Sequence, residues 1–248
     1  MIISFFEEYP TALNLQKLKL ISWPTKLYVA ARSVAEFEKI VGTIKNKNVK
    51  EGVYWPVLQR EEGYWISPFS EKKALQRIFA ELNGKNIPVM LDLELPITRN
   101  PSLMLTQFFS FYANRAIIRN FIQDYRGKVY LAEYYPEGKR KERMLQFMGL
   151  HYPNSKVYVI KMMYHSMHCV NEKVVRRDFR QGVQALGNHF IAGLGTIATG
   201  VLGNEPILSQ EQLKSDLRLA KEAGVREVVV FRLGGMNERY ADVLRARS

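Results

Sequence analysis

The sequence predicts a (β/α)8 barrel, and three observations carry this prediction. The chain has 248 residues, of which 47% are apolar, enough for the core of one large domain. Eight short runs rich in Val, Ile, Tyr and Phe have the composition of β-strands. Helical patterns separate most of these runs, and this alternation is typical of the barrel. We therefore expect a single barrel domain over residues 1–248.

The expected strands recur along the whole chain. They are IISFF (2–6), KLYVAA (26–31), GVYWPVL (52–58), PVMLDLEL (88–95), KVYLAEYY (128–135), KVYVIKMMY (156–164), HFIAGLG (189–195) and EVVVFRL (227–233). Most have a mixed or mostly apolar character, as expected for strands that are buried on both faces. An open doubly wound sheet is the alternative, but it normally has a glycine-rich turn after its first strand, and the sequence there is FFEEYP.

Three of the expected helices have clear end signals. They begin at the N-cap residues Ser33, Ser70 and Ser209 and cover residues 33–45, 70–84 and 209–224. Weaker helical patterns cover 101–125, 139–149, 171–187 and 237–247. We interpret the apolar part of the first of these segments as a long helix packed in the protein, because its arginines argue against a membrane span.

Charge and cysteine content limit the classes of partner. The formal net charge is +12, but basic residues are dense only in GKRKER (138–143) and VVRRDFR (174–180), so a nucleic-acid partner is not favoured over a solvated surface. Cys169 is the single cysteine, which excludes an intrachain disulfide. The N-terminal segment MIISFFEEYP lacks the basic region of a signal peptide. We expect a cytoplasmic protein.

Polar residues gather where the expected strands end, which is where this barrel places its active sites. The most informative run is LDLEL, because strand alternation puts Asp92 and Glu94 on one face and their leucine neighbours on the other. An unpaired carboxylate is costly to bury. The two acids therefore either belong to a structural network or lie at the mouth of a site.

Carboxylates and aromatic rings at strand ends predict chemistry on sugars. One carboxyl protonates the leaving oxygen, and another stabilises or attacks the cationic carbon, or activates water. Neighbouring carboxylates raise the pKa of one of them, and flat rings offer sugars an apolar face. We expect Glu94, Asp92 and Glu133 to be catalytic. The residues expected to contact the substrate are Tyr164, Trp55, Arg232, Glu7 and Tyr134.

Two motifs resemble the chitinase-type barrels of glycoside hydrolase family 18. That family carries Asp-x-x-Asp-x-Asp-x-Glu on its fourth strand and Met-x-Tyr-Asp on its sixth. The end of the first motif falls on Asp92 and Glu94, and the second falls on Met162 and Tyr164. The resemblance implies that Glu94 is the general acid, that Asp92 orients it together with the substrate's N-acetyl group, and that Tyr164 binds the acetyl group.

The match to this family is partial. Ile87 and Met90 stand where the family has its two earlier aspartates, and His165 stands where the second motif ends in Asp. The family 25 lysozymes are similar in their logic, with Asp-x-Glu on the fourth strand and an acid on the first, a place that Glu7 takes here. The sequence therefore predicts a divergent glycoside-hydrolase-like barrel that acts on or binds a carbohydrate.

Two alternatives stay open at this point. The barrel is a non-catalytic module that binds a glycan or a protein partner, or it is a metal-dependent phosphoesterase or nuclease whose strand-end acids hold magnesium or manganese. The His-x-x-His-Cys cluster of His165, His168 and Cys169 and the glycine-rich loops before and after Arg232 are weaker signals for zinc and for phosphate. We expect no metal and no cofactor, and the sequence leaves the oligomeric state open.

Overall fold

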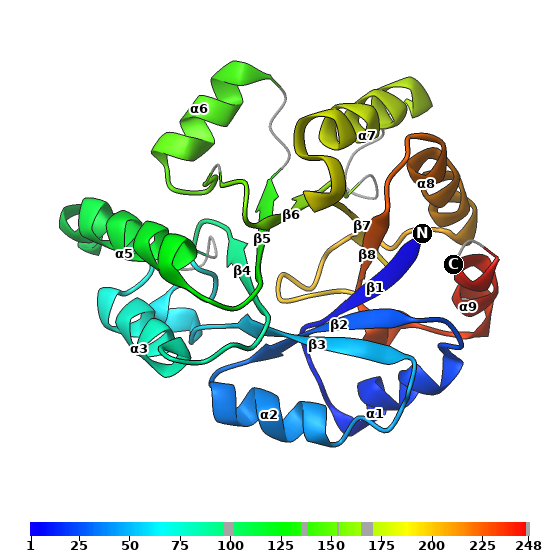
Figure 1. Ribbon diagram of the computed structural model, residues 1–248, viewed down its shortest axis with the longest axis horizontal. Helices are drawn as coiled ribbons and strands as arrows, with labels where there is room; N and C mark the ends of the chain where they lie inside the picture. The colour runs from blue at the N-terminus through cyan, green and yellow to red at the C-terminus, as the bar shows by residue number, and fades with distance from the viewer. Residues whose placement is uncertain (97–101, 135–137, 153, 165–170, 247–248) are drawn as a thin grey trace. The chain divides into compact units, whose positions relative to one another are not determined.

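The computed structural model confirms the predicted fold class (Figure 1). It describes residues 1–96, 102–134, 138–152, 154–164 and 171–246. Eight parallel strands form a closed barrel in sequence order. They are β1 Ile2–Glu7, β2 Thr25–Ala31, β3 Val49–Pro56, β4 Val89–Leu93, β5 Val129–Tyr134, β6 Tyr158–Met162, β7 Phe190–Thr196 and β8 Glu227–Phe231. Each overlaps one of the expected strands.

Helices lie between the strands. They are α1 Ala12–Leu15, α2 Val34–Gly42, α3 Lys72–Leu82, α4 Ser102–Thr106, α5 Phe111–Asp124, α6 Lys139–Phe147, α7 Glu172–Leu186, α8 Gln210–Glu222 and α9 Glu238–Arg245. Short 3-10 turns supplement them at η1 Gln16–Leu20, η2 Arg60–Glu62, η3 Phe108–Ser110, η5 Gly187–His189 and η6 Leu233–Gly235. No helix among the described residues is long and apolar enough to cross a bilayer.

The predicted N-caps are confirmed at two helices and wrong at the third. The hydroxyl of Ser33 accepts a hydrogen bond from Glu36 N, and that of Ser209 accepts one from Gln212 N. Helix α3 begins one residue later than expected, with Glu71 at its N-cap. The Ser70 hydroxyl is used elsewhere, since it donates to Trp65 O at 2.7 Å and accepts from Ser67 N at 3.0 Å.

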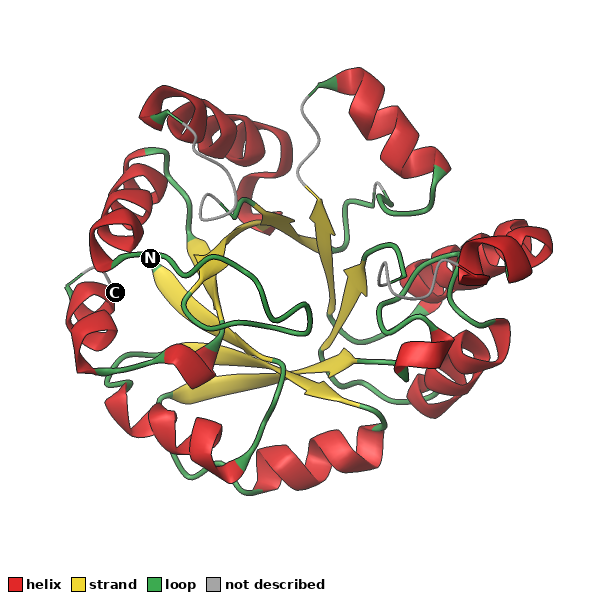
Figure 2. Cartoon of the chain, turned by 180° about the vertical axis from the view of Figure 1, so that it is seen from behind, coloured by secondary structure: helices red, strands yellow, loops and turns green. Residues whose placement is uncertain are grey.

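The chain divides into two compact units, which we describe one at a time. The first contains residues 1–30, 39–53 and 159–248, and the second contains 31–38 and 54–158. In the first unit, β1 pairs with β2 and β8, and β7 pairs with β6 and β8. Helices α7 and α8 pack on β7, and Figure 2 shows them in red beside the yellow strands.

The core of the first unit is closely packed between strands and helices. Phe6 of β1 contacts the rings of Tyr28 and Phe231, with centroids 5.3 and 6.1 Å apart. A polar group lies at the beginning of the same strands, where Glu227 accepts hydrogen bonds from Ser4, Lys26 and Tyr28. Buried polar groups need such partners, and Glu227 has three of them.

The second unit is built on β3, β4 and β5. Tyr54 of β3 pairs with Val89 of β4, and β4 pairs with β5 along its whole length. Helices α3 and α5 pack together, with the rings of Phe79 and Phe121 stacked 4.3 Å apart. The loop between β3 and α3 is fixed by Arg77, which binds both carboxylate oxygens of Glu62 at 2.8 Å.

Candidate active site

The acids of β4 lie at the end of a buried strand. All five residues of β4 are buried, and Asp92 is only 5% exposed. Glu94 follows the strand by one residue and is half-buried. Its Oε2 atom accepts a hydrogen bond of 3.0 Å from the hydroxyl of Tyr134, at the end of β5. The structure therefore brings together two of the residues that the sequence singled out, Glu94 and Tyr134, on neighbouring strands.

The register between β4 and β5 decides which side chains share a face. Asp92 pairs with Ala132, and Leu93 pairs with Glu133. In a parallel sheet, paired residues point to the same side, and successive residues alternate. Glu94 and Tyr134 are the next pair in this series, which agrees with their hydrogen bond. Glu133 therefore lies on the face of Leu93, opposite to the face of Asp92 and Glu94.

Glu133 has partners of its own on that opposite face. The residue is fully buried, and its Oε2 lies 2.8 Å from Nδ1 of His151. Its Oε1 accepts a hydrogen bond of 3.4 Å from the backbone N–H of Tyr152. Glu133 thus fixes the segment that follows α6, and the structure does not bring it together with Glu94.

Tyr134 is a stable hydrogen-bond donor to Glu94. Burial raises the pKa of the Tyr134 phenol, and the negative charges of Glu94 and Asp92 raise it further. Its hydroxyl consequently stays protonated at neutral pH. The whole residue is 38% exposed, so solvent reaches this part of the unit. A permanent donor on Oε2 fixes the orientation of the Glu94 carboxyl group.

The tryptophan expected at the site is nearly buried. Trp55 is 3% exposed, and the pairing of Tyr54 with Val89 places Trp55 level with Met90, on the face of Asp92. Trp65, in the loop after β3, is also buried. This loop is attached to β4 by a hydrogen bond of 3.0 Å from Ile66 N to Asp92 O. Trp55 remains a predicted substrate contact, and its 3% exposure leaves little of the ring for a sugar to contact.

Exposed aromatic rings occur at a place that the sequence analysis missed. Phe108 is 65% exposed, Phe109 93% and Tyr112 68%. They belong to the segment that we expected to be one packed helix, and this expectation is wrong, because the segment is divided into α4, η3 and α5. The run FFSFY was the available signal, since its apolar residues are too closely spaced for one helix face to bury them all.

In the first unit, both carboxylate oxygens of Glu7 accept hydrogen bonds from other residues of the chain. Oε1 accepts hydrogen bonds from Tyr9 N at 2.8 Å, Asn14 Nδ2 at 3.2 Å and Arg232 at 3.2 Å. Oε2 accepts from Gly234 N at 2.7 Å. Burial raises the pKa of Glu7, while the Arg232 charge and the N–H donors act in the opposite direction. Glu7 ties β1 to α1 and η6, and its role as a substrate contact stays a prediction.

Arg232 follows β8 and contacts residues around Glu7. Its Nε donates to Thr199 O at 2.9 Å, and its guanidinium lies 4.8 Å from the ring centre of Tyr9. The peptide bond that precedes Arg232 is cis. The two glycines that follow allow close contacts, since a Cβ on Gly235 would lie 1.9 Å from Ile197 O. These contacts explain the glycines without a phosphate ligand.

Glu8 and Glu205 form a second carboxyl group pair in the first unit. Strand alternation turns Glu8 to the face opposite Glu7, and Glu8 is nearly buried. A Cβ on Gly200 would lie 2.8 Å from Oε2 of Glu8 and 3.0 Å from Oε1 of Glu205. The glycine therefore allows both carboxyl groups to approach the same point. The sequence alone gives no reason to bring these two acids together, because they are far apart along the chain.

Tyr164 also belongs to the first unit. It follows β6, is half-buried, and its ring centre lies 6.3 Å from that of Phe231. The first unit thus contains Tyr164, Arg232 and Glu7, whereas the second contains the acids of β4 with Tyr134 and Trp55. The role of Tyr164 in substrate binding stays a prediction.

The two metal hypotheses of the sequence analysis have different outcomes. The His-x-x-His-Cys cluster, residues 165–169, lies outside the described residues. Within the described part of the chain, no three His, Cys, Asp or Glu side chains gather as a metal site requires. Glu7, which the magnesium hypothesis included, already has an arginine as partner.

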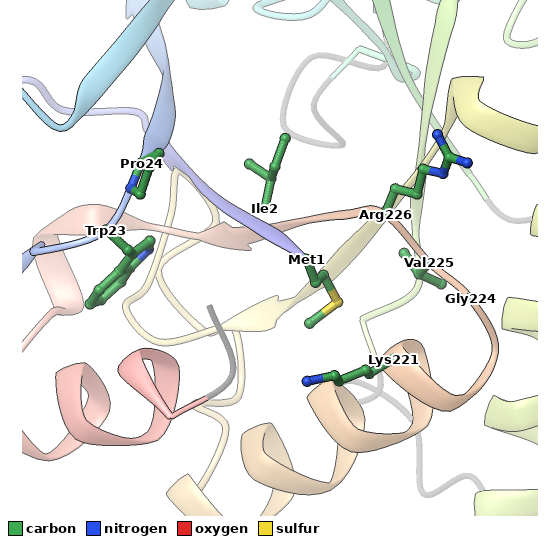
Figure 3. A pocket seen from close by; sticks show the side chains of 8 residues that line it. All are labelled: Met1, Ile2, Trp23, Pro24, Lys221, Gly224, Val225 and Arg226. Carbon is green, nitrogen blue, oxygen red and sulfur yellow. The ribbon is translucent and has the colours of Figure 1, made fainter.

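A large surface pocket of the first unit lies at the beginning of the strands (Figure 3). Its volume is about 460 Å³, and it is lined by Met1, Ile2, Trp23, Pro24, Lys221, Gly224, Val225 and Arg226. These residues precede or begin β1, β2 and β8. Functional residues of this barrel come from the opposite strand ends, so this pocket is not the candidate active site.

Comparison with solved structures finds the same fold in proteins of very different sequence. The PgaB (BpsB) glycoside hydrolase domain from Bordetella bronchiseptica is similar with a TM-score of 0.56 at 12% identity, over 99% of this chain and 97% of that one. A xylose isomerase domain protein from Planctomyces limnophilus gives a TM-score of 0.54 at 10% identity, over 99% and 94%. No protein-family model and no curated protein matches the sequence. The likenesses show the barrel fold.

Proposed function

We propose that this barrel acts on or binds a carbohydrate at the carboxyl groups of β4, with Glu94 as general acid and Asp92 beside it. The observation that carries the proposal is the hydrogen bond of 3.0 Å from Tyr134 to Glu94 Oε2, on the face that Asp92 shares. A general acid must present its proton in a fixed direction, and a donor held on one carboxyl oxygen fixes that direction.

The carboxyl group of Asp92 affects the protonation of Glu94. A second negative charge close to a carboxylate favours the protonated form of one of the two groups, which is the form that a general acid needs near neutral pH. Asp92 is nearly buried, so its charge is weakly screened by solvent. The similarity to a glycoside hydrolase domain agrees with the proposal at the level of the fold.

The proposal is tested by hydrolysis of a panel of aryl glycosides, with sugars that carry an acetamido group first, because the partial family 18 motif implies them. Glu94→Gln keeps the size of the side chain and removes its proton, so we expect release of the aryl group to fall at least about a hundredfold. Glu38→Gln is the matched control, because Glu38 is an exposed acid of the same unit. Equal activity in Glu94→Gln and wild type would refute Glu94 as the acid.

A specific observation favours a second candidate for the catalytic pair. The carboxyl groups of Glu8 and Glu205 both lie against Gly200, and a glycosidase uses two neighbouring carboxyl groups. Glu8→Gln and Glu205→Gln therefore belong in the same assay. Loss of activity in these variants, with full activity in Glu94→Gln, would move the proposed reaction to the acids of the first unit.

Binding without turnover is the outcome that supports the non-catalytic alternative. In that case the wild-type protein and Glu94→Gln retain oligosaccharides on a glycan array, and neither releases product. A metal-dependent phosphoesterase would instead cleave aryl phosphates, lose this activity to EDTA and regain it with Mn²⁺. Each of the alternative functions can thus be tested with a different substrate or ligand. A cytoplasmic location stays a prediction.

A further inference from the structure

A polar pocket of the second unit has a lining that does not include Asp92, Glu94 or Tyr134. It has a volume of about 180 Å³. It lies between α5, the end of α6 and the segment that leads to β6; Figure 1 shows both helices in green. Its polar lining includes Arg115, Arg119, Gln123, Gln146, His151 and Tyr152.

Two arginines give this pocket a positive charge. Arg115 and Arg119 are four residues apart on α5, so their side chains lie on the same helix face. Arg115 donates to the backbone oxygen of Gln146 at 3.0 Å. Among the described residues, no carboxylate forms an ion pair with either guanidinium. Like charges at this spacing destabilise a helix unless an anion binds between them.

Tyr152 supplies a donor without a partner at the same place. The residue is 7% exposed, and its hydroxyl is buried and has no hydrogen bond in the described part of the chain. Burial raises the pKa of this phenol, the charges of Arg115 and Arg119 lower it, and the charge of Glu133 raises it. The hydroxyl lies beside Gly149, where an added Cβ would be 2.9 Å from it, and a buried hydroxyl without a partner is costly.

The segment that carries Tyr152 is held firmly in place. Glu133 of β5 lies 2.8 Å from His151 Nδ1 and accepts from the backbone N–H of Tyr152. The other ring nitrogen of His151 lies 3.5 Å from Glu142. Glu133 and Glu142 thus both lie close to His151. A fixed set of donors binds with a smaller loss of entropy than a mobile one.

We propose that this pocket binds a phosphate-class oxyanion, either inorganic phosphate or the phosphate group of a monoester. Guanidinium groups match the geometry of phosphate oxygens and bind them through two parallel hydrogen bonds. The donors come from α5, from α6 and from the segment after it, so they suit a tetrahedral group with three or more acceptor oxygens better than a planar carboxylate. The site is independent of the proposed reaction at Glu94.

The test measures binding by titration calorimetry at constant ionic strength, with inorganic phosphate and glucose 6-phosphate as probes and with chloride and glucose as controls. We expect saturable binding of one or both phosphate probes. Tighter binding of glucose 6-phosphate would identify a monoester as the ligand class. Equal or tighter binding of inorganic phosphate would identify the free ion.

Variants connect the binding to the named residues. Arg115→Gln and Arg119→Gln should each weaken phosphate binding about tenfold or more, because each removes charge-assisted hydrogen bonds. Tyr152→Phe should weaken it about fivefold without lowering the urea midpoint, since the hydroxyl has no described partner to lose. The matched control is Arg126→Gln, an exposed arginine just beyond α5 that does not line the pocket.

Two results would overturn the proposal. One is an absence of saturable binding of either phosphate probe to the wild-type protein. The other is an equal loss of binding in Arg119→Gln and Arg126→Gln, which would mean that general positive charge attracts the anion. Arg119 is exposed on α5, so its variant is expected to fold and keeps the test decisive if Arg115→Gln does not.

Discussion

The hydroxyl of Tyr134 donates a hydrogen bond of 3.0 Å to Oε2 of Glu94, across the ends of β5 and β4. The residues are 40 positions apart in the sequence, and the register of two parallel strands brings them to one face. This contact selects Glu94 and Asp92 as the candidate acids and leaves Glu133 on the other face.

Removal of the Tyr134 hydroxyl tests whether this contact matters for activity. Under the proposed function, Tyr134→Phe should lower kcat/KM about ten- to a hundredfold, because a hydrogen bond to a charged group contributes about 1.5–3 kcal/mol. The matched control is Tyr125→Phe, which removes a hydroxyl that donates to Ile87 O at 2.8 Å. That variant should lower the urea midpoint and leave kcat/KM unchanged. The reverse pattern would assign Tyr134 a structural role only.

The pair of Glu7 and Arg232 predicts a pH-dependent stability. The Arg232 charge opposes the raised pKa of Glu7, so Arg232→Met should raise that pKa further. Below the ordinary pKa of a glutamate, Glu7 is protonated in the folded and unfolded states, and the ion pair contributes nothing. As pH rises through the pKa of the folded state, the variant must bury an unpaired carboxylate, which should cost about 3 kcal/mol at pH 8.

Urea unfolding at pH 4 and pH 8 measures this difference. The free energy of unfolding of wild type minus that of Arg232→Met should be small at pH 4 and should grow toward pH 8. Arg239→Met, at an exposed arginine of α9, is the control and should show little difference at either pH. A penalty that is the same at both pH values would show that Arg232 acts through packing alone.

Glu227 and Lys26 form a second ion pair, whose contribution to stability can be measured. Lys26 Nζ lies 2.7 Å from Glu227 Oε2, and the carboxylate also accepts hydrogen bonds from Ser4 and Tyr28. Lys26→Met leaves a buried charge without its cation and should cost about 3 kcal/mol in urea unfolding. The double variant Lys26→Met with Glu227→Gln should recover part of the loss. No recovery would mean that the stem of Lys26, not its charge, supports the strands.

Gly182 of α7 lies directly against Phe190, the first residue of β7. A Cβ at this position would lie 2.4 Å from the ring of Phe190, which is buried. Gly182→Ala should therefore destabilise the protein by about 1–3 kcal/mol. Gly42→Ala is the control at the end of α2, where a Cβ would contact nothing within 4 Å. It should be neutral or slightly stabilising. Equal effects of the two substitutions would contradict the packing described here.

The sequence predicts the fold well because each element carries its own local signal. Apolar runs of strand length alternate with helical patterns, and Ser33 and Ser209 occupy their N-caps as expected. Ser70 does not, because Trp65 O lies within reach of its hydroxyl, and such competition between partners is decided only in the folded chain. Local patterns thus locate the elements better than they locate individual side-chain contacts.

The candidate site is predicted less completely, and the reason is register. Alternation along β4 places Asp92 and Glu94 on one face from sequence alone. The face of Glu133 depends on how β5 aligns with β4, and a shift of one residue would have reversed it. Glu7 is a similar case, because one of its partners, Gly234, is 227 residues away.

The most direct test of the central claim is a crystal structure of Glu94→Gln with an oligosaccharide that the wild-type protein cleaves or binds. We predict a glycosidic oxygen within about 2.6–3.2 Å of the side chain at position 94, the distance that proton transfer requires. A sugar bound elsewhere on the protein, with no contact to positions 92, 94 or 134, would contradict the account.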